Sequence, residues 1–461
     1  MRGLSESNIC FVSNFNKTFF FDAIARRLHD LGASIYWISV NPKLHGWLEE
    51  RWNPDSLCLV GKDYIDHDSP GTGEYKLNEL ILGDRVWRLM PDDGFKYLRN
   101  IQRPLLSFLT DNQIDIIFGE LTWGHELLIH RLSRQLSPRS CTYVVPHTIR
   151  IPNGRFAFFT GENQSDMVPL PPPDEMRISV TPVLRAEKPD YLALNDVLLK
   201  RSRSVGQRVA KVKRFFTKEN IHEGDPTVID NNWLRLGQRV REEWNKESYR
   251  LVKRVSFQSI TGKPYLFYAL HKQPEASIDV IGRYYEDQFA NIRNLWRILP
   301  ESWLLAVKEH TNAIGDRPLS FYRQLQKLRN VVLVDEKADS HSLIKNAKLV
   351  ATVSGTVAYE AALMDVPAIT LAPTFFNALP SCRYVTLESL KTLTSIDSLL
   401  SIPADAKDEF EQFIMRNSCE GIISDPISNP ACMTSENIAK VTEAFCRLII
   451  SRMESNSEVA S

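Results

Sequence analysis

Short apolar runs alternate with amphipathic segments along much of the chain, most clearly between residues 303 and 372. The apolar runs there are WLLAV at 303–307, VVLVD at 331–335 and LVATV at 349–353, and their β-branched residues indicate strands. Between them, Phe321, Leu325 and Leu328 recur at helical spacing. Strands that alternate with helices predict a parallel sheet covered by helices on both faces.

The N-terminal part shows the same alternation. Residues 8–40 contain an apolar run, an amphipathic segment that ends at Gly32 and a second apolar run, which predict a strand, a helix and a strand. A comparable system of strands and helices begins again at Tyr265. The polar loop at 14–18 lacks G-x-G-x-x-G, which disfavours a dinucleotide bound in the usual manner. We therefore expect this loop to meet an acceptor.

These patterns predict an α/β fold of two Rossmann-like domains that face each other across a cleft, with a helical linker and a C-terminal helix. A length of 461 residues suits two cores better than one. We place the first domain at 1–185 and the second at 256–435. A basic helical linker is expected at 186–255, and a closing helix with a tail at 436–461. Frequent proline between 168 and 189 marks the connection.

The whole chain has no net charge, but one stretch of it is rich in basic residues. Lys and Arg number 56, as do Asp and Glu, so the net charge is zero and nucleic acid is not an expected partner. A basic, helix-patterned stretch nevertheless runs from Tyr191 to Arg254. Its simplest interpretation is a set of solvated helix faces. The alternative is docking on an anionic membrane surface or acceptor.

Cysteine usage and hydropathy bear on the compartment. Seven cysteines are scattered without a C-x-x-C pair, which is typical of reduced thiols in a cytosolic protein. No window approaches the roughly 20 apolar residues that a membrane-spanning helix needs. We therefore expect a cytoplasmic protein, with a peripheral contact at the inner membrane left open by the basic stretch.

Residues that directly follow the predicted strands are candidates for ligand binding, because ligands of parallel sheets bind outside the carboxyl ends of the strands. Ser354, Gly355 and Thr356 stand where a strand turns into a helix, a place suited to phosphate. Glu360 lies one turn later on an apolar face and would need a partner such as a pair of ribose hydroxyls. The simpler interpretation is a helix cap followed by an exposed glutamate.

A second set of binding candidates, Lys308, Glu309 and His310, follows another predicted strand. His310 could instead be a satisfied histidine at a strand end. Arg150 and Arg155, on the loop after a further strand, suit bidentate contact with carboxylate or phosphate, and they suit surface ion pairs equally well.

Three carboxylates of the N-terminal half are candidates for a general base or a nucleophile. Asp92 and Asp93 precede a predicted helix, where aspartate is most often a capping residue. Glu120 ends a predicted strand and should point at the ligand crevice, although it could also cap the helix that follows. The sequence leaves the choice among the three open.

Two Rossmann-like halves, one with a phosphate-suited helix start and a ribose-suited glutamate, describe the GT-B architecture of glycosyltransferases that use nucleotide sugars. The donor would lie on the C-terminal half and the acceptor would enter from the N-terminal half. Several separated motifs resemble the bacterial capsule polysaccharide biosynthesis family, which includes the Kdo transferases of capsule assembly. They are VKEHTNAIGDRPLSFYRQL, LHKQPEAS, SGTVAYEAALMDVPAI and PHTIRIPNGRFAFF. The resemblance covers most of the chain and is clearest from Tyr265 to Asn377.

This resemblance implies a CMP-activated donor, foremost CMP-Kdo, and a glycan or glycolipid acceptor. In CMP-sugar transferases of related architecture, a His-Pro dipeptide addresses the nucleotide phosphate and a Ser/Thr pair helps to hold it. His310 matches that histidine, with Thr311 in place of the proline, and Ser354 and Thr356 match the hydroxyl pair.

Two further matches follow from family patterns. Gln273 and Glu275 fall where the family pattern favours contacts with donor or acceptor, although they could merely fix their loop. The sequence Asp92-Asp93-Gly94 resembles the acidic motif that supplies the base in bacterial sialyltransferases.

The expected reaction breaks the bond between a sugar and a CMP phosphate that gains negative charge. His310, Lys308 and the N–H groups after Ser354 would stabilise that charge. We expect neither a metal nor a cofactor, since no D-x-D motif ends a predicted strand. A carboxylate of the N-terminal half would deprotonate the acceptor hydroxyl or attack the anomeric carbon. Two rival functions remain, a UDP-sugar transferase or epimerase of the same fold, and a catalytically silent capsule-assembly subunit that binds polysaccharide or lipid.

Overall fold

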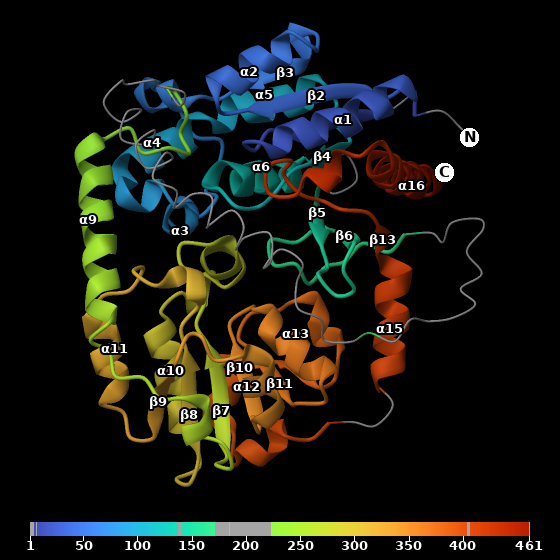
Figure 1. Cartoon of the computed structure of the whole chain (residues 1–461). Coiled ribbons are helices and arrows are strands. Elements are labelled where there is room, and N and C mark those ends of the chain that lie inside the picture. Colours follow the sequence, from blue (N-terminus) through green and yellow to red (C-terminus); the bar gives the residue numbers. More distant parts are fainter. Residues whose placement is uncertain are drawn as a thin grey trace.

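A computed structural model of the chain describes residues 4–5, 7–136, 141–170, 184, 223–402 and 406–460. The chain forms two α/β halves, each built on one central sheet (Figure 1). Most of the proline-rich stretch at 168–189 and the basic residues 191–222 lie outside the described residues.

The first half holds a seven-stranded sheet in the order β13-β6-β5-β4-β1-β2-β3. The strands from β3 to β5 pair in parallel, as predicted, whereas β6 and β13 add an antiparallel edge. The strands are β1 (Asn8–Val12), β2 (Ser34–Ser39), β3 (Leu57–Leu59), β4 (Ile116–Phe118), β5 (Thr142–Thr148), β6 (Arg155–Phe159) and β13 (Cys419–Glu420). The helices are α1 (Lys17–Asp30), α2 (Pro42–Glu49), α3 (Leu77–Gly83), α4 (Pro91–Asn100), α5 (Gln102–Asp111), α6 (Gly124–Gln135) and α16 (Ser435–Ala460).

Side chains of β1 alternate between two cores, which explains why this strand is apolar from Ile9 to Val12. Ile9 and Phe11 belong to the core shared with α1 and α16, whereas Cys10 and Val12 belong to the core shared with α4, α5 and α6. Successive side chains of a strand point to opposite faces of the sheet. A strand covered by helices on both faces must therefore be apolar at every position.

The second half holds a six-stranded sheet in the order β12-β11-β10-β7-β8-β9, and all of its strand pairs are parallel. The strands are β7 (Tyr265–Ala269), β8 (Leu304–Lys308), β9 (Val331–Val334), β10 (Leu349–Thr352), β11 (Ala368–Thr370) and β12 (Cys382–Tyr384). The helices are α10 (Gln288–Arg297), α11 (Leu319–Gln326), α12 (Ser340–Asn346), α13 (Thr356–Leu363), α14 (Leu387–Thr392) and α15 (Ala406–Asn417). This confirms the predicted arrangement of two Rossmann-like domains.

The chain returns to the first half before its end. Strand β13 pairs with β6, so residues 419–420 already belong to the first sheet, whereas the sequence placed the end of the second domain at 435. Helix α16 then packs on the same sheet, with Phe445 fully buried against Phe11, Phe118 and Phe158. The C-terminal helix is therefore part of the first domain's core. Two residues of strand were too short a signal for sequence analysis to find.

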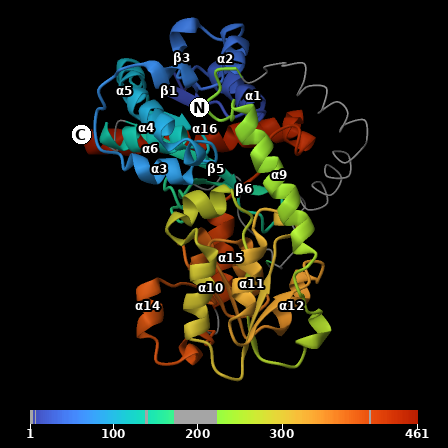
Figure 2. The ribbon, with the colours of Figure 1, turned by 90° about the vertical axis from the view of Figure 1, so that its left-hand side faces the viewer.

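Helix α9 (Asn232–Tyr249) is the described part of the expected linker. It runs along one side of the molecule from the first half to the second (Figure 2). The Asn231 side chain accepts hydrogen bonds from the backbone N–H groups of Trp233 and Leu234, 3.0 and 3.1 Å away, and so begins the helix. Among the described residues, no helix combines the length and the apolar character that crossing a membrane requires.

Ion pairs and hydrogen bonds join the two halves beside the cleft. Arg88 of the first half pairs with the buried carboxylate of Asp279 in the second, at 2.6 Å. In the opposite direction, Arg283 of the second half pairs with Glu79 and Glu162 of the first. The halves are thus held at a fixed separation by charged groups supplied from both sides.

Candidate functional site

A cleft with a volume of about 490 Å³ lies between the two halves, a size in the range of small-molecule sites. Its N-terminal wall comes from segments around residues 120–122, 145–150 and 161–164. Its C-terminal wall comes from segments around 269–277, 310–312, 352–357 and 375–376.

Strand order explains why these segments meet. In the first sheet, β1 to β3 are added toward one side and β4 onwards toward the other, so the strand order reverses between β1 and β4. In the second sheet it reverses between β7 and β10. Ligands of such sheets bind where the order reverses, outside the carboxyl ends of the strands. Asn14 and Glu120 follow β1 and β4, whereas His271 and Ser354 follow β7 and β10. The places where the strand order reverses in the two sheets therefore face each other across the cleft.

His271 fixes the turn between β10 and α13. Its Nε2 atom accepts a hydrogen bond from the Thr352 hydroxyl at 2.8 Å and lies 3.3 and 3.4 Å from the backbone nitrogens of Val353 and Ser354. Complete burial lowers the pKa of His271 to about 3, so the ring is neutral and keeps its acceptor lone pair at physiological pH. His271 thus fixes the backbone of the turn, and Ser354, Gly355 and Thr356 of the turn line the cleft.

Gly355 is required in this turn by the space around it. Its φ of −74° is open to any residue. A Cβ atom there, however, would lie 2.8 Å from the Thr352 hydroxyl oxygen and 3.3 Å from the His271 ring. The glycine lets the turn close over His271, after which α13 begins at Thr356 with its first N–H groups beside the cleft. Such a helix start suits an anionic group.

The other predicted residues of this motif divide between the cleft and the protein interior. Ser354 and Thr356 line the cleft, and the Ser354 hydroxyl donates to the Ser277 carbonyl oxygen at 2.5 Å. Glu360 is 8% exposed and does not line the cleft; its Oε2 atom lies 3.0 Å from Nε2 of His341. The partner of Glu360 in this structure is thus a histidine of α12.

Three consecutive candidates after β8 have different surroundings. His310 lines the cleft, and desolvation together with Lys272 and Lys308 lowers its pKa, although Glu275 acts in the opposite direction. The ammonium group of Lys308 donates to the Ser340 hydroxyl at 2.7 Å and does not line the cleft. Lys272, which sequence analysis did not select, does line it.

Glu309 is a structural residue, so its interpretation as a substrate-binding residue is wrong. It is 2% exposed and accepts from the Arg317 guanidinium at 2.7 and 2.9 Å, from the Tyr322 hydroxyl at 2.6 Å and from the backbone N–H of His310 at 2.7 Å. These bonds satisfy the carboxylate within the protein. Both residues lie beyond the end of β8, where Glu309 turns to Arg317 and its neighbour His310 lines the cleft.

The loop after β7 holds the candidates Gln273 and Glu275. Gln273 donates to Asp279 at 3.0 Å and accepts from Gln288 at 3.3 Å, so it fixes the loop and does not line the cleft. Glu275 is exposed in the cleft, where its carboxylate accepts from the Ser277 hydroxyl at 3.0 Å. Only the second of the two is positioned to meet a ligand.

Glu120 is the predicted carboxylate that the structure places in the cleft. Its Oε1 atom forms an ion pair with Lys17, and its Oε2 atom accepts from the Asn14 amide at 3.0 Å. The Tyr143 hydroxyl donates to its backbone oxygen at 2.7 Å. The side chain of Glu120 is 24% exposed. It is therefore held in one orientation and still reachable from the cleft.

Asp92, Asp93 and Arg155 do not reach the cleft. The two aspartates lie in the first turn of α4 and do not line the cavity. Arg155 is 7% exposed and donates to the Ser418 hydroxyl and carbonyl oxygens at 2.9 and 2.6 Å, which fastens β6 to the segment before β13. Arg150, by contrast, lines the cleft.

Glu126, which sequence analysis missed, lies behind Glu120 and shares its Asn14 contact. It is fully buried and accepts from the Asn14 amide at 2.9 Å and from the backbone N–H groups of Thr122 and Trp123 at 2.7 and 3.1 Å. Burial, and next the Glu120 charge, raise its pKa from 4.5 to about 8. Glu126 is thus protonated at neutral pH.

This shift predicts a pH-dependent stability. Because the folded pKa of Glu126 lies above the unfolded value, the folded state binds more protons, and the free energy of unfolding should fall as pH rises from about 4.5 to about 8. Glu126→Gln should flatten this slope, since glutamine keeps an oxygen for the Thr122 and Trp123 N–H groups but does not titrate. Urea unfolding at pH 5 and pH 8.5 measures the difference. An equal slope in both proteins would contradict the protonated Glu126.

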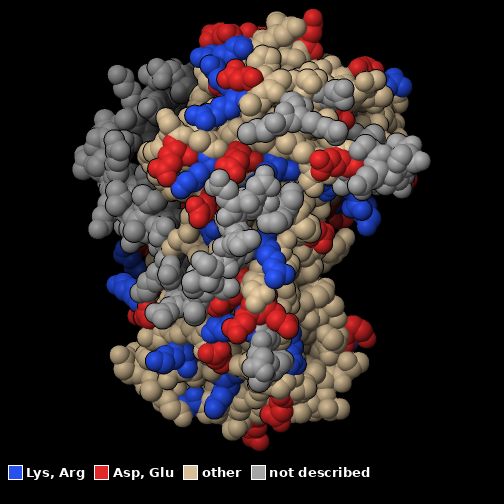
Figure 3. Space-filling view, turned by 90° about the vertical axis from the view of Figure 1, so that its right-hand side faces the viewer, with Lys and Arg blue, Asp and Glu red and all other residues tan. Residues whose placement is uncertain are grey.

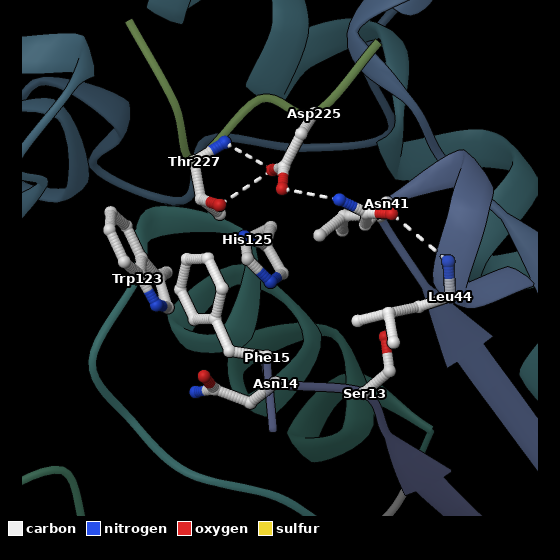
Figure 4. A pocket seen from close by; sticks show the side chains of 10 residues that line it. Ser13, Asn14, Phe15, Asn41, Leu44, Trp123, His125, Asp225 and Thr227 are labelled. Carbon is white, nitrogen blue, oxygen red and sulfur yellow. Dashed lines mark hydrogen bonds between the residues drawn. The ribbon is translucent and has the colours of Figure 1, made fainter. Parts of the chain in front are cut away.

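A small second pocket adjoins Glu120 through Asn14 (Figure 4). His125 and Phe15 lie together there with Trp123, and the Phe15 and Trp123 ring centroids are 5.8 Å apart. Ser13 and His125 are 2% and 1% exposed, and within the described chain neither Ser13 Oγ nor His125 Nε2 has a hydrogen-bond partner. Burial lowers the pKa of His125 to about 3 and keeps the ring neutral. The pocket offers polar atoms able to meet hydroxyl groups.

Sequence analysis missed several residues of the site for different reasons. His271 follows a strand just as His310 does, so the same strand-end signal could have selected it. Lys17, the first residue of α1, belongs to the polar loop at 14–18 that the sequence predicted to meet an acceptor, although it was not selected by itself. Glu126 carries no such signal, since it lies inside α6 and reaches the site only through tertiary packing. Within the residues that the structure describes, no group of three or more His, Cys, Asp or Glu side chains could hold a metal ion.

No protein-family model matches the chain, and no curated protein matches it either. Solved structures similar to it include the UDP-GlcNAc 2-epimerase of Methanocaldococcus jannaschii, with 12% identity over 88% of this chain and 99% of that one and a TM-score of 0.25. KpsC of Thermosulfurimonas dismutans, a β-Kdo 2,7 transferase, shows 14% identity over 70% and 84% of the two chains and a TM-score of 0.33. MurG of Acinetobacter baumannii shows 10% identity over 95% and 99%, with a TM-score of 0.24. Similarities of this size assign no function to the chain.

Proposed function

We propose that the protein is a glycosyltransferase that takes a nucleotide-sugar donor on its C-terminal half and an acceptor on its N-terminal half. One observation carries the proposal: the helix start at Ser354-Gly355-Thr356 and the Glu120 carboxylate line the same cleft from opposite halves. The first feature suits the phosphate of a donor. The second suits a base or nucleophile at the sugar.

The donor phosphate has a defined set of partners in this proposal. N–H groups at the start of α13 would hold it, with His310 and Lys272 on the neighbouring loops. As the bond to the sugar breaks, negative charge grows on the phosphate oxygen, and fixed donors of hydrogen bonds stabilise that charge without having to reorganise. Lys308 takes no direct part, because its ammonium group is turned to Ser340.

On the acceptor side, Glu120 is the reacting carboxylate. As a general base it would take the proton of the acceptor hydroxyl while that oxygen attacks the anomeric carbon and CMP leaves with the bonding electrons. As a nucleophile it would attack that carbon itself and expel CMP with the bonding electrons. The acceptor oxygen would then displace the Glu120 carboxylate from the carbon and lose its proton to water. The Lys17 and Asn14 contacts orient Glu120.

For the donor, we propose a CMP-sugar, foremost CMP-Kdo, and for the acceptor a glycan or glycolipid of a surface polysaccharide. The support is the resemblance of the motifs around His310, Ser354 and Thr356, all three of which line the cleft. Neither a metal ion nor a cofactor enters the proposed reaction.

Calorimetric titration with CMP, UDP and their sugars tests the donor. Wild type should bind CMP ligands more tightly than UDP ligands, and His310→Ala should weaken CMP binding, because a phosphate contact is lost. His67→Ala removes a half-exposed histidine that does not line the cleft and should bind as wild type does. Preference for UDP would move the proposal to a UDP-sugar enzyme. If neither nucleotide binds, or if His310→Ala binds CMP as tightly as wild type does, a non-catalytic subunit would be favoured.

A further inference from the structure

Helix α9 carries an apolar stripe on its solvent side. Its large apolar side chains are exposed to the extents of 82% for Trp233, 42% for Leu236, 61% for Val240 and 74% for Trp244. Spacings of three, four and four residues place all four on one face of the helix. Leu251, 76% exposed, continues the same face beyond the helix end. Isolated exposed apolar residues are ordinary, but a continuous stripe with two tryptophans is not.

A different face fixes the helix to the molecule. Asn245, Ser248 and Tyr249 are buried, and the Asn245 amide donates to the Gly315 carbonyl oxygen at 3.0 Å. The Tyr249 ring packs against Tyr322, with centroids 5.0 Å apart. The stripe is therefore not the surface by which α9 docks on the protein, and its side chains are exposed to solvent.

Unpaired arginines accompany the stripe. Arg235, Arg239 and Arg241 form no ion pair with any described residue, whereas Lys246 and Arg250 are paired with glutamates of the helix itself. These two cations balance two of the three glutamates of α9, so with the three arginines the helix keeps a net positive charge. Arg239 and Arg241 flank the stripe, at three residues from Leu236 and Trp244, whereas Arg235 lies on the opposite side of the helix. On the opposite side of the molecule, Figure 3 shows basic and acidic side chains interspersed.

The arginines also connect the helix to the cleft. Arg235 and Arg239 line a groove of about 320 Å³ together with Arg85 and Trp123. Arg85 lines the main cleft as well, with its guanidinium 5.2 Å from the centre of a Trp123 ring. The groove and the cleft thus share Arg85.

We propose that this face of α9 docks on a membrane surface that contains anionic lipids. Tryptophans sit at the level of lipid headgroups, where the ring is part buried and part wet, and arginines next to them attract anionic headgroups. The helix lies on such a surface and does not cross it. A second copy of the chain fits less well, because two stripes packed together would bring the unpaired arginines of both copies side by side.

Flotation with lipid vesicles tests the docking without any dependence on catalysis. Wild type should float with vesicles of phosphatidylcholine and phosphatidylglycerol and should not float with phosphatidylcholine alone. Trp233→Ser/Trp244→Ser should lose flotation. Each of Arg239→Gln and Arg241→Gln should weaken partitioning about fivefold, since one basic residue near an anionic surface has an effect of that size.

A matched control removes exposed apolar side chains elsewhere. Leu82 and Ile427 are 57% and 62% exposed, and Leu82→Ser/Ile427→Ser should float as wild type does. Wild type that fails to float with anionic vesicles overturns the proposal, as does a tryptophan variant that floats unchanged. A wild-type dimer that dissociates in the tryptophan variant, measured by light scattering, would replace the membrane with a second copy. Loss of donor binding in His310→Ala bears only on the proposed function, so the two can fail separately.

Discussion

Glu120→Gln is expected to lower the rate of sugar transfer by about 10²–10⁴-fold, the range that a positioned general acid or base contributes. Glutamine has nearly the same shape and can still accept from Asn14, but it can neither take a proton from an acceptor hydroxyl nor attack an anomeric carbon. Donor binding should stay close to wild type, because the donor contacts lie on the other half. Transfer rates and calorimetric donor affinity, measured on the same preparation, separate the two effects.

Asp93→Asn is the matched control for this experiment. Asp93 is a carboxylate of the same domain that lies in the first turn of α4 and does not line the cleft, so transfer should continue at the wild-type rate. Glu120→Gln with full activity, together with an inactive Asp93→Asn, would reverse the assignment. Urea unfolding of both variants shows whether the lost Lys17 ion pair, and not the chemistry, lowers the rate.

Arg317→Leu is expected to lower the free energy of unfolding by about 3–5 kcal/mol, because it leaves the buried Glu309 carboxylate without its counter-charge. Both side chains are almost fully buried, with exposures of 8% for Arg317 and 1% for Glu309. The Tyr322 hydroxyl and the His310 N–H would remain, but neither carries a positive charge. Urea unfolding measures the loss.

Arg329→Leu provides the comparison, since its ion pair with Glu301 has a similar distance of 3.0 Å but exposures of 73% and 81%. An exposed pair of this kind contributes about 0–1 kcal/mol, so this variant should unfold almost as wild type does. If Arg317→Leu were equally mild and instead abolished donor binding, Glu309 would have to be returned to the binding site.

Sequence analysis could predict the sheets because the strands of a buried parallel sheet are apolar throughout. It could also predict that Glu120, His310 and Ser354 reach the cleft, because each follows such a strand and ligands of parallel sheets bind outside the carboxyl ends of the strands. It could not separate Glu309 from His310. These neighbours point in opposite directions, and the position of Arg317 decides which direction is inward.

Long-range pairing explains most of the remaining differences. Arg155 is fastened to Ser418, 263 residues away, and β13 joins a sheet whose other strands lie in the first 160 residues. Nothing local signals either contact. For α9, apolar residues at helical spacing predicted an amphipathic helix. The apolar face of such a helix, here the one with Trp233 and Trp244, is normally buried. The structure buries Asn245, Ser248 and Tyr249 instead, which only the packing of the second half could reveal.

The most direct measurement is NMR observation of CMP-Kdo and UDP-GlcNAc, each incubated with the wild-type protein. The proposed function predicts that CMP-Kdo is consumed and CMP released faster than in a sample without protein, while UDP-GlcNAc stays unchanged. Consumption or epimerisation of UDP-GlcNAc, with CMP-Kdo decaying only at its spontaneous rate, would contradict the account.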